Sequence, residues 1–140
     1  MTTEFQKAKE AVRNLKRKIL IASSISGEGH LASAFSILDI LWVLYSSILR
    51  IYPDDPYCEK RDRFILSKGH ASLGLYAILA DKGFFHLDDL TTFAEFKSKL
   101  GGHPDRNKVP GVEASTGSLG HGFPMAIGMA LGLKMKKSPC

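Results

Sequence analysis

Apolar residues near the start of the chain recur at alternating steps of three and four, and basic residues occupy most of the remaining face. The apolar set is Phe5, Ala8, Val12, Leu15, Ile19 and Ala22. This period is that of an amphipathic α-helix. Ser26-Gly27-Glu28-Gly29 follows, and glycine accepts the left-handed conformation with which many helices end. We therefore predict a first helix that ends at these glycines, with His30 just beyond it.

A second segment, from Ser33 or Ser36 to Leu49, is apolar on almost every side, and a helix of that kind needs neighbours on all sides. Leu31 to Leu49 is nearly long enough to span a membrane, but Asp39 at its centre would cost about 2.5 to 3.5 kcal/mol in lipid. We therefore predict a buried helix. Asp39 is either a carboxylate tuned for chemistry or, as we favour, one that caps a turn or binds a loop.

The pattern changes after the proline-rich turn at Tyr52 to Pro56. Arg63 to Leu66 is a short apolar run bounded by charges, which is typical of a buried strand, and Ala71 to Asp81 has a helical pattern. Strand, glycine-containing turn and helix form the unit of parallel α/β sheets, where ligands collect at the carboxyl ends of the strands. His70 lies at such an end. We predict the α/β class: a helix-rich, partial three-layer α/β domain that lacks its later strands.

The second half of the chain alternates helical patterns with a long irregular stretch. Phe84 to Lys99 predicts one or two short helices. Leu100 to Gly122 has little periodicity and many glycines and prolines, and loops of this length are usually functional or disordered. Met125 to Lys136 returns to a helical pattern in which Gly128 and Gly132 would allow close packing.

Composition points to a single globular domain. The 140 residues are 44% apolar and 24% charged, with a formal net charge of +5, which is ordinary for a soluble protein. The basic residues concentrate in Lys7 to Lys18 and Lys134 to Lys137 without an aromatic platform, so a solvated face is favoured over a nucleic-acid site. Cys58 and Cys140 lack disulfide or zinc spacing. No targeting segment is apparent, and we expect a reducing, cytoplasmic location.

Four of the five histidines directly follow a glycine: His30, His70, His103 and His121. Glycine lets the backbone turn sharply and a ligand approach it, while imidazole donates or accepts a hydrogen bond near neutral pH. We interpret the pairs as binding positions on loops, the alternative being that each histidine caps a turn. A zinc cluster is disfavoured because there is no local histidine pair or neighbouring cysteine. Ser115 and Ser118 lack the elbow of a serine nucleophile.

Four motifs follow one another along the chain. They are Glu28-Gly29-His30, the run from Asp62 to Ala71, Gly102-His103-Pro104-Asp105, and the run from Pro110 to Gly120. Together they resemble the amino-terminal, diphosphate-binding part of transketolase, in the form of the amino-terminal subunit of split bacterial and archaeal transketolases. The resemblance covers nearly the whole chain. Related deoxyxylulose-phosphate synthases lack its Ser-Lys-Gly-His and Gly-His-Pro-Asp sequences.

The resemblance implies a thiamine-diphosphate-dependent transferase of carbohydrate metabolism, as in the pentose phosphate pathway. Transketolases move a two-carbon ketol unit between sugar phosphates, and the cofactor carries the difficult step. By motif position, His30 and His103 would be catalytic and face the carbonyl and hydroxyl end of the substrate, where imidazoles hydrogen-bond and transfer protons.

The same resemblance implies a set of cofactor-binding residues. His70 would approach the diphosphate of thiamine diphosphate. Gly117 would give a backbone contact to the aminopyrimidine, with Ser118 beside it. Leu119 would pack against the cofactor rings and impose their bent shape.

The chain departs from the family pattern in two motifs. Leu31-Ala32 follows His30 where the family often has Pro-Gly or Ile-Gly, and Gly120-His121-Gly122 stands where it usually has Gly-Gln-Gly. In the family, a later Gly-Asp-Gly motif and an asparagine bind the Mg²⁺ that holds the diphosphate. Residues 1–140 contain no Gly-Asp-Gly motif, and the asparagine follows that motif in the family. We therefore expect the metal ligands to lie outside this chain, which would be a truncated amino-terminal portion of the domain.

These observations leave three functions open. The first is part of a transketolase completed by a complementary subunit or a homo-oligomer, with no nucleic-acid or membrane partner and no activity alone. The second is a catalytically inactive fragment or association module. The third is a basic-helix binding module. Without the later strands of the domain, the apolar helix Phe35 to Leu49 would lack some of its cover, so we expect poor solubility or oligomers of the isolated chain.

Overall fold

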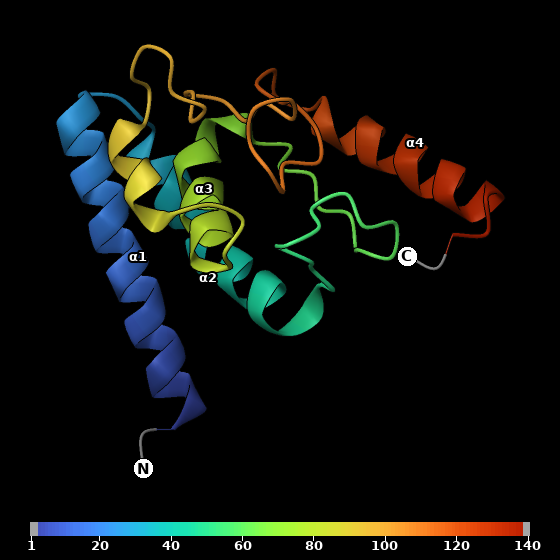
Figure 1. Cartoon of the computed structure of the whole chain (residues 1–140), viewed down its shortest axis with the longest axis horizontal. Coiled ribbons are helices and arrows are strands. Elements are labelled where there is room, and N and C mark those ends of the chain that lie inside the picture. The colour runs from blue at the N-terminus through green and yellow to red at the C-terminus, as the bar shows by residue number, and fades with distance from the viewer. Residues whose placement is uncertain (1–2, 139–140) are drawn as a thin grey trace.

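The computed structural model describes residues 3–138, and its regular elements are all helical (Figure 1). Cys140, the last residue of the predicted domain, lies outside the described range. The elements in order are α1 (Glu4–Ser26), α2 (Leu31–Val43) with a π-helical turn (Leu44–Ile48), a 3-10 turn (Gly69–Ala71), α3 (Ser72–Asp81), a 3-10 helix (Leu87–Thr92) and α4 (Gly122–Met135). The helices predicted at the start, middle and end of the chain are therefore confirmed.

Helix α1 has the start and stop signals that its sequence supplies. The Thr3 side chain and the Gln6 side chain cap each other's backbone amides at the amino-terminal end, an arrangement that satisfies otherwise unpaired donors. Gly27 ends the helix with a left-handed φ of 69°. The buried residues are Val12, Leu15, Ile19 and Ala22. All four belong to the predicted apolar stripe.

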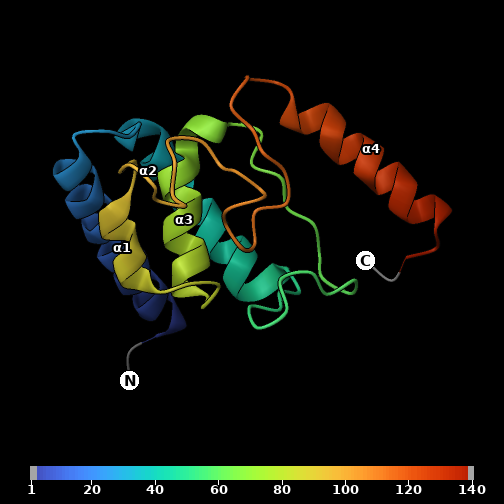
Figure 2. The same ribbon diagram turned by 45° about the horizontal axis from the view of Figure 1, so that its top comes forward.

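The core lies where α1, α2 and α3 pack against one another (Figure 2). Every residue of α3 from Ser72 to Ala80 is buried, so this helix is the centre of the domain. Gly74 lets α2 approach closely, because a Cβ at this position would lie 3.0 Å from the Ala34 carbonyl oxygen. The fold thus builds one core around a central helix.

Helix α2 is buried on one side only, which corrects the prediction of a fully buried helix and agrees with the expectation that part of its cover is missing. Ala34, Leu38 and Leu41 are buried, whereas Ile40 and Ile48 are each 61% exposed. The cause is that α1 and α3 flank only part of its surface. Residues 31–48 also meet the length and composition of a membrane span, a test that core helices of soluble proteins pass too.

Two details of α2 differ from the sequence-based expectation. The helix begins at Leu31 with His30 as its N-cap, earlier than Ser33 or Ser36. Asp39 neither caps a turn nor lies in a buried site, because its carboxylate is 70% exposed and pairs with Lys16 of α1 at 3.1 Å. This carboxylate has a solvated structural role.

The predicted strand at Arg63 to Leu66 is an irregular segment without a strand partner. A strand needs a neighbouring strand to pair its backbone groups, and residues 3–138 contain no strand that could serve as that neighbour. The Thr116 hydroxyl donates to the Leu66 carbonyl at 2.7 Å instead. The strand predicted for the α/β domain is therefore not present in the part of the chain described here.

Helix α4 lies apart from α1, α2 and α3 in both views (Figures 1 and 2). It approaches the rest of the chain closely at Gly122, where a Cβ would lie 2.5 Å from the Ser67 Cα. Nothing lies within 4 Å of a Cβ placed at Gly128 or Gly132, so the close packing predicted there does not occur within residues 3–138. Its exposed apolar residues are Phe123, Met125, Ile127, Leu131 and Met135.

This exposed apolar face predicts self-association. We expect the isolated chain to be larger than a monomer by light scattering, because contiguous apolar surface of this kind drives association. Replacing Ile127 and Leu131 together by glutamate should shift the population toward monomer. Monomeric wild-type protein at high concentration would contradict the expectation.

Candidate functional site

The structure brings three of the predicted site histidines together. The His30 and His70 ring centroids lie 4.9 Å apart, and those of His70 and His103 lie 4.8 Å apart. Each pair is nearly perpendicular, with interplanar angles of 84°. His70 is therefore the middle ring of a row whose members come from three separate segments. We name His30, His70 and His103 the histidine cluster.

A glycine with an unusual backbone conformation delivers His30 to this cluster. Gly29 has a φ of 109°, and a Cβ there would lie 3.2 Å from the Phe93 ring, so both conformation and space favour glycine. The Ser23 hydroxyl donates to the Glu28 carbonyl at 2.7 Å and holds the turn. His30 then occupies the N-cap of α2 without a capping side-chain hydrogen bond, which leaves its imidazole available for other contacts.

His70 lies in the 3-10 turn just before α3, and two neighbouring residues fix that turn. Lys68 reaches α2, where its ammonium donates to the Ser36 hydroxyl at 2.8 Å and to the Ser33 carbonyl at 3.3 Å. Gly69 packs against the opposite loop so closely that a Cβ would lie 2.6 Å from the Thr116 carbonyl oxygen. The turn is therefore held between α2 and the loop that carries Thr116.

That loop also brings Gly117 to His103. A Cβ at Gly117 would lie 3.2 Å from Cδ2 of the His103 ring, and the Thr116 amide donates to the Pro104 carbonyl at 3.3 Å. Ser118 is exposed, and the Leu119 side chain is 66% exposed. The structure thus joins Gly117 to the histidine cluster, and it leaves the next two predicted residues open to solvent.

His121, the fourth histidine that follows a glycine, has a different setting. It is exposed and occupies the N-cap of α4 without a capping side-chain hydrogen bond. The alternative that these histidines cap turns is thus correct in position for His30 and His121, but neither side chain makes the capping bond. The imidazoles are not used as helix caps.

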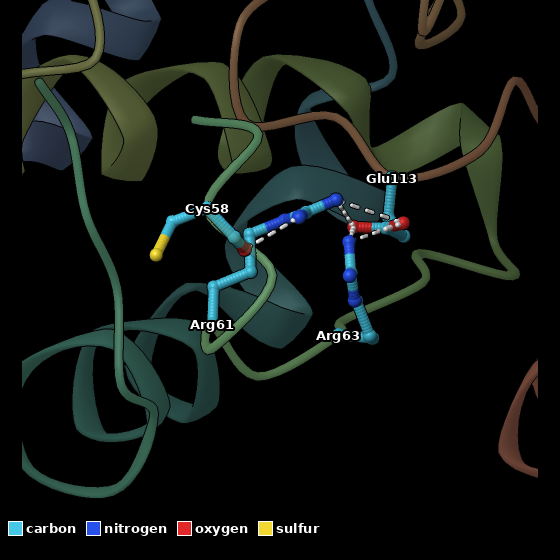
Figure 3. Close-up of polar contacts among 4 residues, drawn as sticks. All are labelled: Cys58, Arg61, Arg63 and Glu113. Atoms are coloured by element: carbon cyan, nitrogen blue, oxygen red, sulfur yellow. Dashed lines mark hydrogen bonds and ion pairs between the residues drawn. The ribbon is translucent and has the colours of Figure 1, made fainter. Parts of the chain in front are cut away.

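A buried ion cluster anchors the Thr116 loop and was not predicted from the sequence (Figure 3). The Glu113 carboxylate pairs with Arg61 at 2.9 Å and with Arg63 at 3.3 Å. Arg61 also donates to the Cys58 carbonyl at 2.8 Å. The Glu113 side chain is 7% exposed. The arginines lie about 50 residues before the glutamate, so no local sequence pattern predicts the contact. The only sign of it in the sequence is that the fourth motif contains an acidic residue, Glu113.

The histidine cluster changes the acid–base behaviour of His103. Burial of part of the ring, and then the neighbouring His70 and His30 imidazoles, lower the pKa of His103 below its ordinary value. A protonated His103 would lose hydration and face other rings that can carry positive charge. His103 is therefore neutral at pH 7, with one ring nitrogen able to donate and the other able to accept a hydrogen bond.

The lowered pKa of His103 predicts a loss of stability in mild acid. The unfolded chain binds this proton at a higher pH than the folded chain, so the free energy of unfolding falls as pH drops from the ordinary histidine pKa toward the folded value. Urea denaturation at pH 7.5 and 5.5 measures the effect. His103→Asn should reduce this pH dependence, whereas His86→Asn, at an exposed histidine, should retain it; an equal pH dependence in all three proteins would contradict the prediction.

The histidine cluster offers hydrogen-bonding groups rather than a metal site. Nδ1 of His70 is buried and has no hydrogen-bond partner, and a buried polar atom of this kind needs a partner from water or a ligand. No group of three or more histidine, cysteine or acidic side chains in residues 3–138 is arranged to hold a metal ion. The donor set therefore fits a polar organic ligand better than a directly bound metal.

Residues 6–139 match the family described as "Transketolase, thiamine diphosphate binding domain". The chain belongs to this family. The match includes all six residues that the sequence predicts at the site, and the family is named for the binding of thiamine diphosphate. The unpartnered His70 nitrogen and the exposed Leu119 are compatible with such a ligand.

Curated relatives match the chain over part of their own length. The chain is 49% identical to a protein named Ferredoxin fas2 from Rhodococcoides fascians, over 84% of this chain and 38% of that protein. It is 43% identical to an apulose-4-phosphate transketolase subunit from Phocaeicola vulgatus, over 92% of this chain and 45% of that relative. The chain thus spans less than half the length of either protein.

A solved transketolase has the same fold over this region. A transketolase from Campylobacter jejuni superposes with a TM-score of 0.83 and 35% identity, covering 93% of this chain and 20% of that one. The helical arrangement described here is therefore that of part of a transketolase. In coarse terms this supports the predicted fold, although the described residues contain no sheet.

Proposed function

We propose that this chain forms the amino-terminal part of a thiamine-diphosphate-dependent transketolase that transfers a two-carbon ketol unit between sugar phosphates. The observation that carries the proposal is the contact of His30, His70 and His103 in one row, with Gly117 against His103. Four family motifs that are distant in the sequence contribute to this one region. The relative whose name specifies an apulose-4-phosphate transketolase supports a sugar phosphate as the substrate class.

In this proposal the chain's own residues bind and orient the two reactants. Bound thiamine diphosphate would supply the carbon centre that stabilises negative charge during carbon–carbon bond cleavage. His70 would donate to a diphosphate oxygen, the backbone of Gly117 and Ser118 would contact the aminopyrimidine, and Leu119 would cover the rings. The turn that carries His70 and the loop that carries Gly117 are each held by contacts to the rest of the domain, which would reduce the ordering that cofactor binding requires.

His30 and His103 would act on the substrate. Neutral His103 can accept the proton of a substrate hydroxyl as that hydroxyl becomes a carbonyl, and the imidazolium that forms can return the proton in the reverse step. Burial and the neighbouring imidazoles lower the pKa of His103, which keeps the ring in the neutral form that accepts a proton. His30, at the other end of the row, would hydrogen-bond a substrate hydroxyl. His70 separates the two rings and limits their mobility.

The proposed activity needs further polypeptide. Diphosphate binding requires a cation with oxygen ligands, and the described residues offer no such group. The Phocaeicola vulgatus relative is named as one subunit of its transketolase, which supports a second, complementary polypeptide as the partner. The exposed apolar face of α4 favours the same conclusion, and it equally supports the alternative of an inactive association module.

Titration calorimetry distinguishes the two functions. Thiamine diphosphate and Mg²⁺ should bind the chain when a complementary transketolase subunit is present, and more weakly or not at all without it. An inactive association module would bind the partner subunit but show no heat of binding for thiamine diphosphate. Absence of cofactor binding in every combination would overturn the proposed function.

His103→Ala tests the proposed catalytic role. We expect turnover of the reconstituted enzyme to fall about 100-fold or more, the usual contribution of a general acid or base, while the free energy of unfolding changes by less than about 0.5 kcal/mol, as for other exposed side chains. Steady-state kinetics and urea denaturation measure the two effects. His86→Ala, at an exposed histidine on another element, should leave both unchanged. A His103→Ala variant whose loss of turnover is explained by a matching loss in the free energy of unfolding would contradict a catalytic role.

A further inference from the structure

Two hydroxyl groups of α3 hold the backbone of the loop that carries His103. The Ser72 hydroxyl donates to the Gly102 carbonyl at 2.7 Å. The Tyr76 hydroxyl lies 3.0 Å from the Gly101 carbonyl oxygen and 2.9 Å from the His103 carbonyl oxygen. Ser72 and Tyr76 are four residues apart and therefore lie on one face of the helix. Two side chains thus contact three consecutive carbonyl groups.

Both hydroxyls lie where water has little access. Ser72 is 1% exposed and Tyr76 is not exposed, so water does not compete for them. Burial, and then the Asp105 carboxylate, raise the pKa of Tyr76 above its ordinary value. The phenol therefore keeps its proton at neutral pH and remains a donor.

The two glycines that precede His103 have no close packing of their own, although the Thr116 amide holds the loop at Pro104. Nothing lies within 4 Å of a Cβ placed at Gly102, and at Gly101 the nearest atom would be 3.7 Å away. Two consecutive glycines give the backbone wide conformational freedom. The carbonyl contacts to Ser72 and Tyr76 therefore restrict a segment whose own sequence leaves it free to move.

Helix α3 also determines where His70 lies, because His70 belongs to the 3-10 turn that leads directly into it. One helix thus carries the middle ring of the histidine cluster and the two hydroxyls that hold the loop of the third ring. From this geometry we propose that Ser72 and Tyr76 are positioning residues that set the His70–His103 contact. As far as it concerns cofactor and substrate, this proposal rests on the proposed function.

The competing explanation is that Tyr76 and Ser72 only fill space in the core. Tyr76 packs against Phe93, with ring centroids 6.3 Å apart. A phenylalanine at this position keeps the ring and removes only the donor, and alanine at Ser72 likewise removes one hydroxyl. Tyr76→Phe and Ser72→Ala therefore separate positioning from packing.

The test measures the pKa of each histidine by NMR in the wild-type chain, Tyr76→Phe and Ser72→Ala. We expect the pKa of His103 to rise toward its ordinary value in both variants, because its ring leaves a partly buried place beside His70 and His30. The values for the exposed His86 and His121 should not change. Tyr45→Phe is the matched control: it removes the hydroxyl of another buried tyrosine, whose ring packs on Phe64 and which is not hydrogen-bonded to this loop in the contacts described.

Affinity for thiamine diphosphate with Mg²⁺ and a complementary subunit supplies the second measurement. We expect about a tenfold loss in each variant, corresponding to about 1.4 kcal/mol, the scale of one hydrogen bond. An unchanged pKa of His103 together with unchanged affinity, with stability reduced, would overturn the proposal in favour of a packing role. A raised pKa of His103 in a protein whose wild type binds no cofactor would support the positioning role and overturn the proposed function.

Discussion

Gly69→Ala is expected to unfold the chain at a markedly lower urea concentration than the wild type. A Cβ at this position would lie 2.6 Å from the Thr116 carbonyl oxygen and 2.9 Å from the Gly117 amide nitrogen. Both are backbone atoms, so neither can rotate away as a side chain would. Overpacking of this kind costs about 1 to 3 kcal/mol, and we expect about 3 kcal/mol here. The same change should separate His70 from the Gly117 loop and weaken binding of thiamine diphosphate.

Gly102→Ala is the matched control for this clash. It makes the same chemical change in the same site region, but nothing lies within 4 Å of the added carbon. We expect its free energy of unfolding to stay within about 0.5 kcal/mol of the wild type. If the two variants lost equal stability, the close approach of Gly69 to Thr116 would not be the cause.

Glu113→Ala has the second largest expected effect, a loss of about 3 kcal/mol in the free energy of unfolding. The substitution leaves Arg61 and Arg63 without their common carboxylate, and their side chains are only 13% and 18% exposed. Removing one partner of a buried ion pair is costly because the remaining charge is neither hydrated nor paired. Urea denaturation at pH 7 measures the change.

Two control variants distinguish the stability contributed by this buried ion cluster from that of an ordinary surface ion pair. Burial raises the pKa of Glu113 while Arg63 and Arg106 oppose the rise. Glu113→Gln keeps the shape of the side chain and one acceptor oxygen for the arginines, so it should cost less than Glu113→Ala. Asp39→Ala breaks an exposed pair with Lys16 and should cost less than about 1 kcal/mol. Equal losses in Glu113→Ala and Asp39→Ala would contradict the assigned role.

Helix prediction from the sequence succeeded where the chain supplies its own signals. α1 has an apolar stripe and a glycine stop, and both are used. The start of α2 was placed too late because Ser33 and Ser36 look like caps, whereas in the structure the Ser36 hydroxyl donates to the Ser33 carbonyl within the helix. The local sequence of residues 63–66 could not decide whether they form a strand, because a strand also needs a partner strand that this sequence pattern does not reveal.

The candidate site was predicted as far as its residues belong to motifs. The resemblance identified His30, His70, His103 and Gly117, and the structure brings these four together. It did not identify Tyr76 or the partners of Glu113. Those contacts join residues 25 to 52 positions apart, and hydroxyl or arginine side chains at single positions carry no spacing that would reveal them.

The attachment of α4 at Gly122 has a consequence for how the chain holds together. A fourteen-residue helix is only marginally stable in water when it lacks tertiary support, and the far turns of α4 receive little. The three-helix core should therefore behave as one cooperative unit, while the carboxyl-terminal turns of α4 melt and re-form independently. If another polypeptide docks on those turns, they would become part of the cooperative unit. The first structural effect of assembly would therefore be ordering of the carboxyl-terminal half of α4.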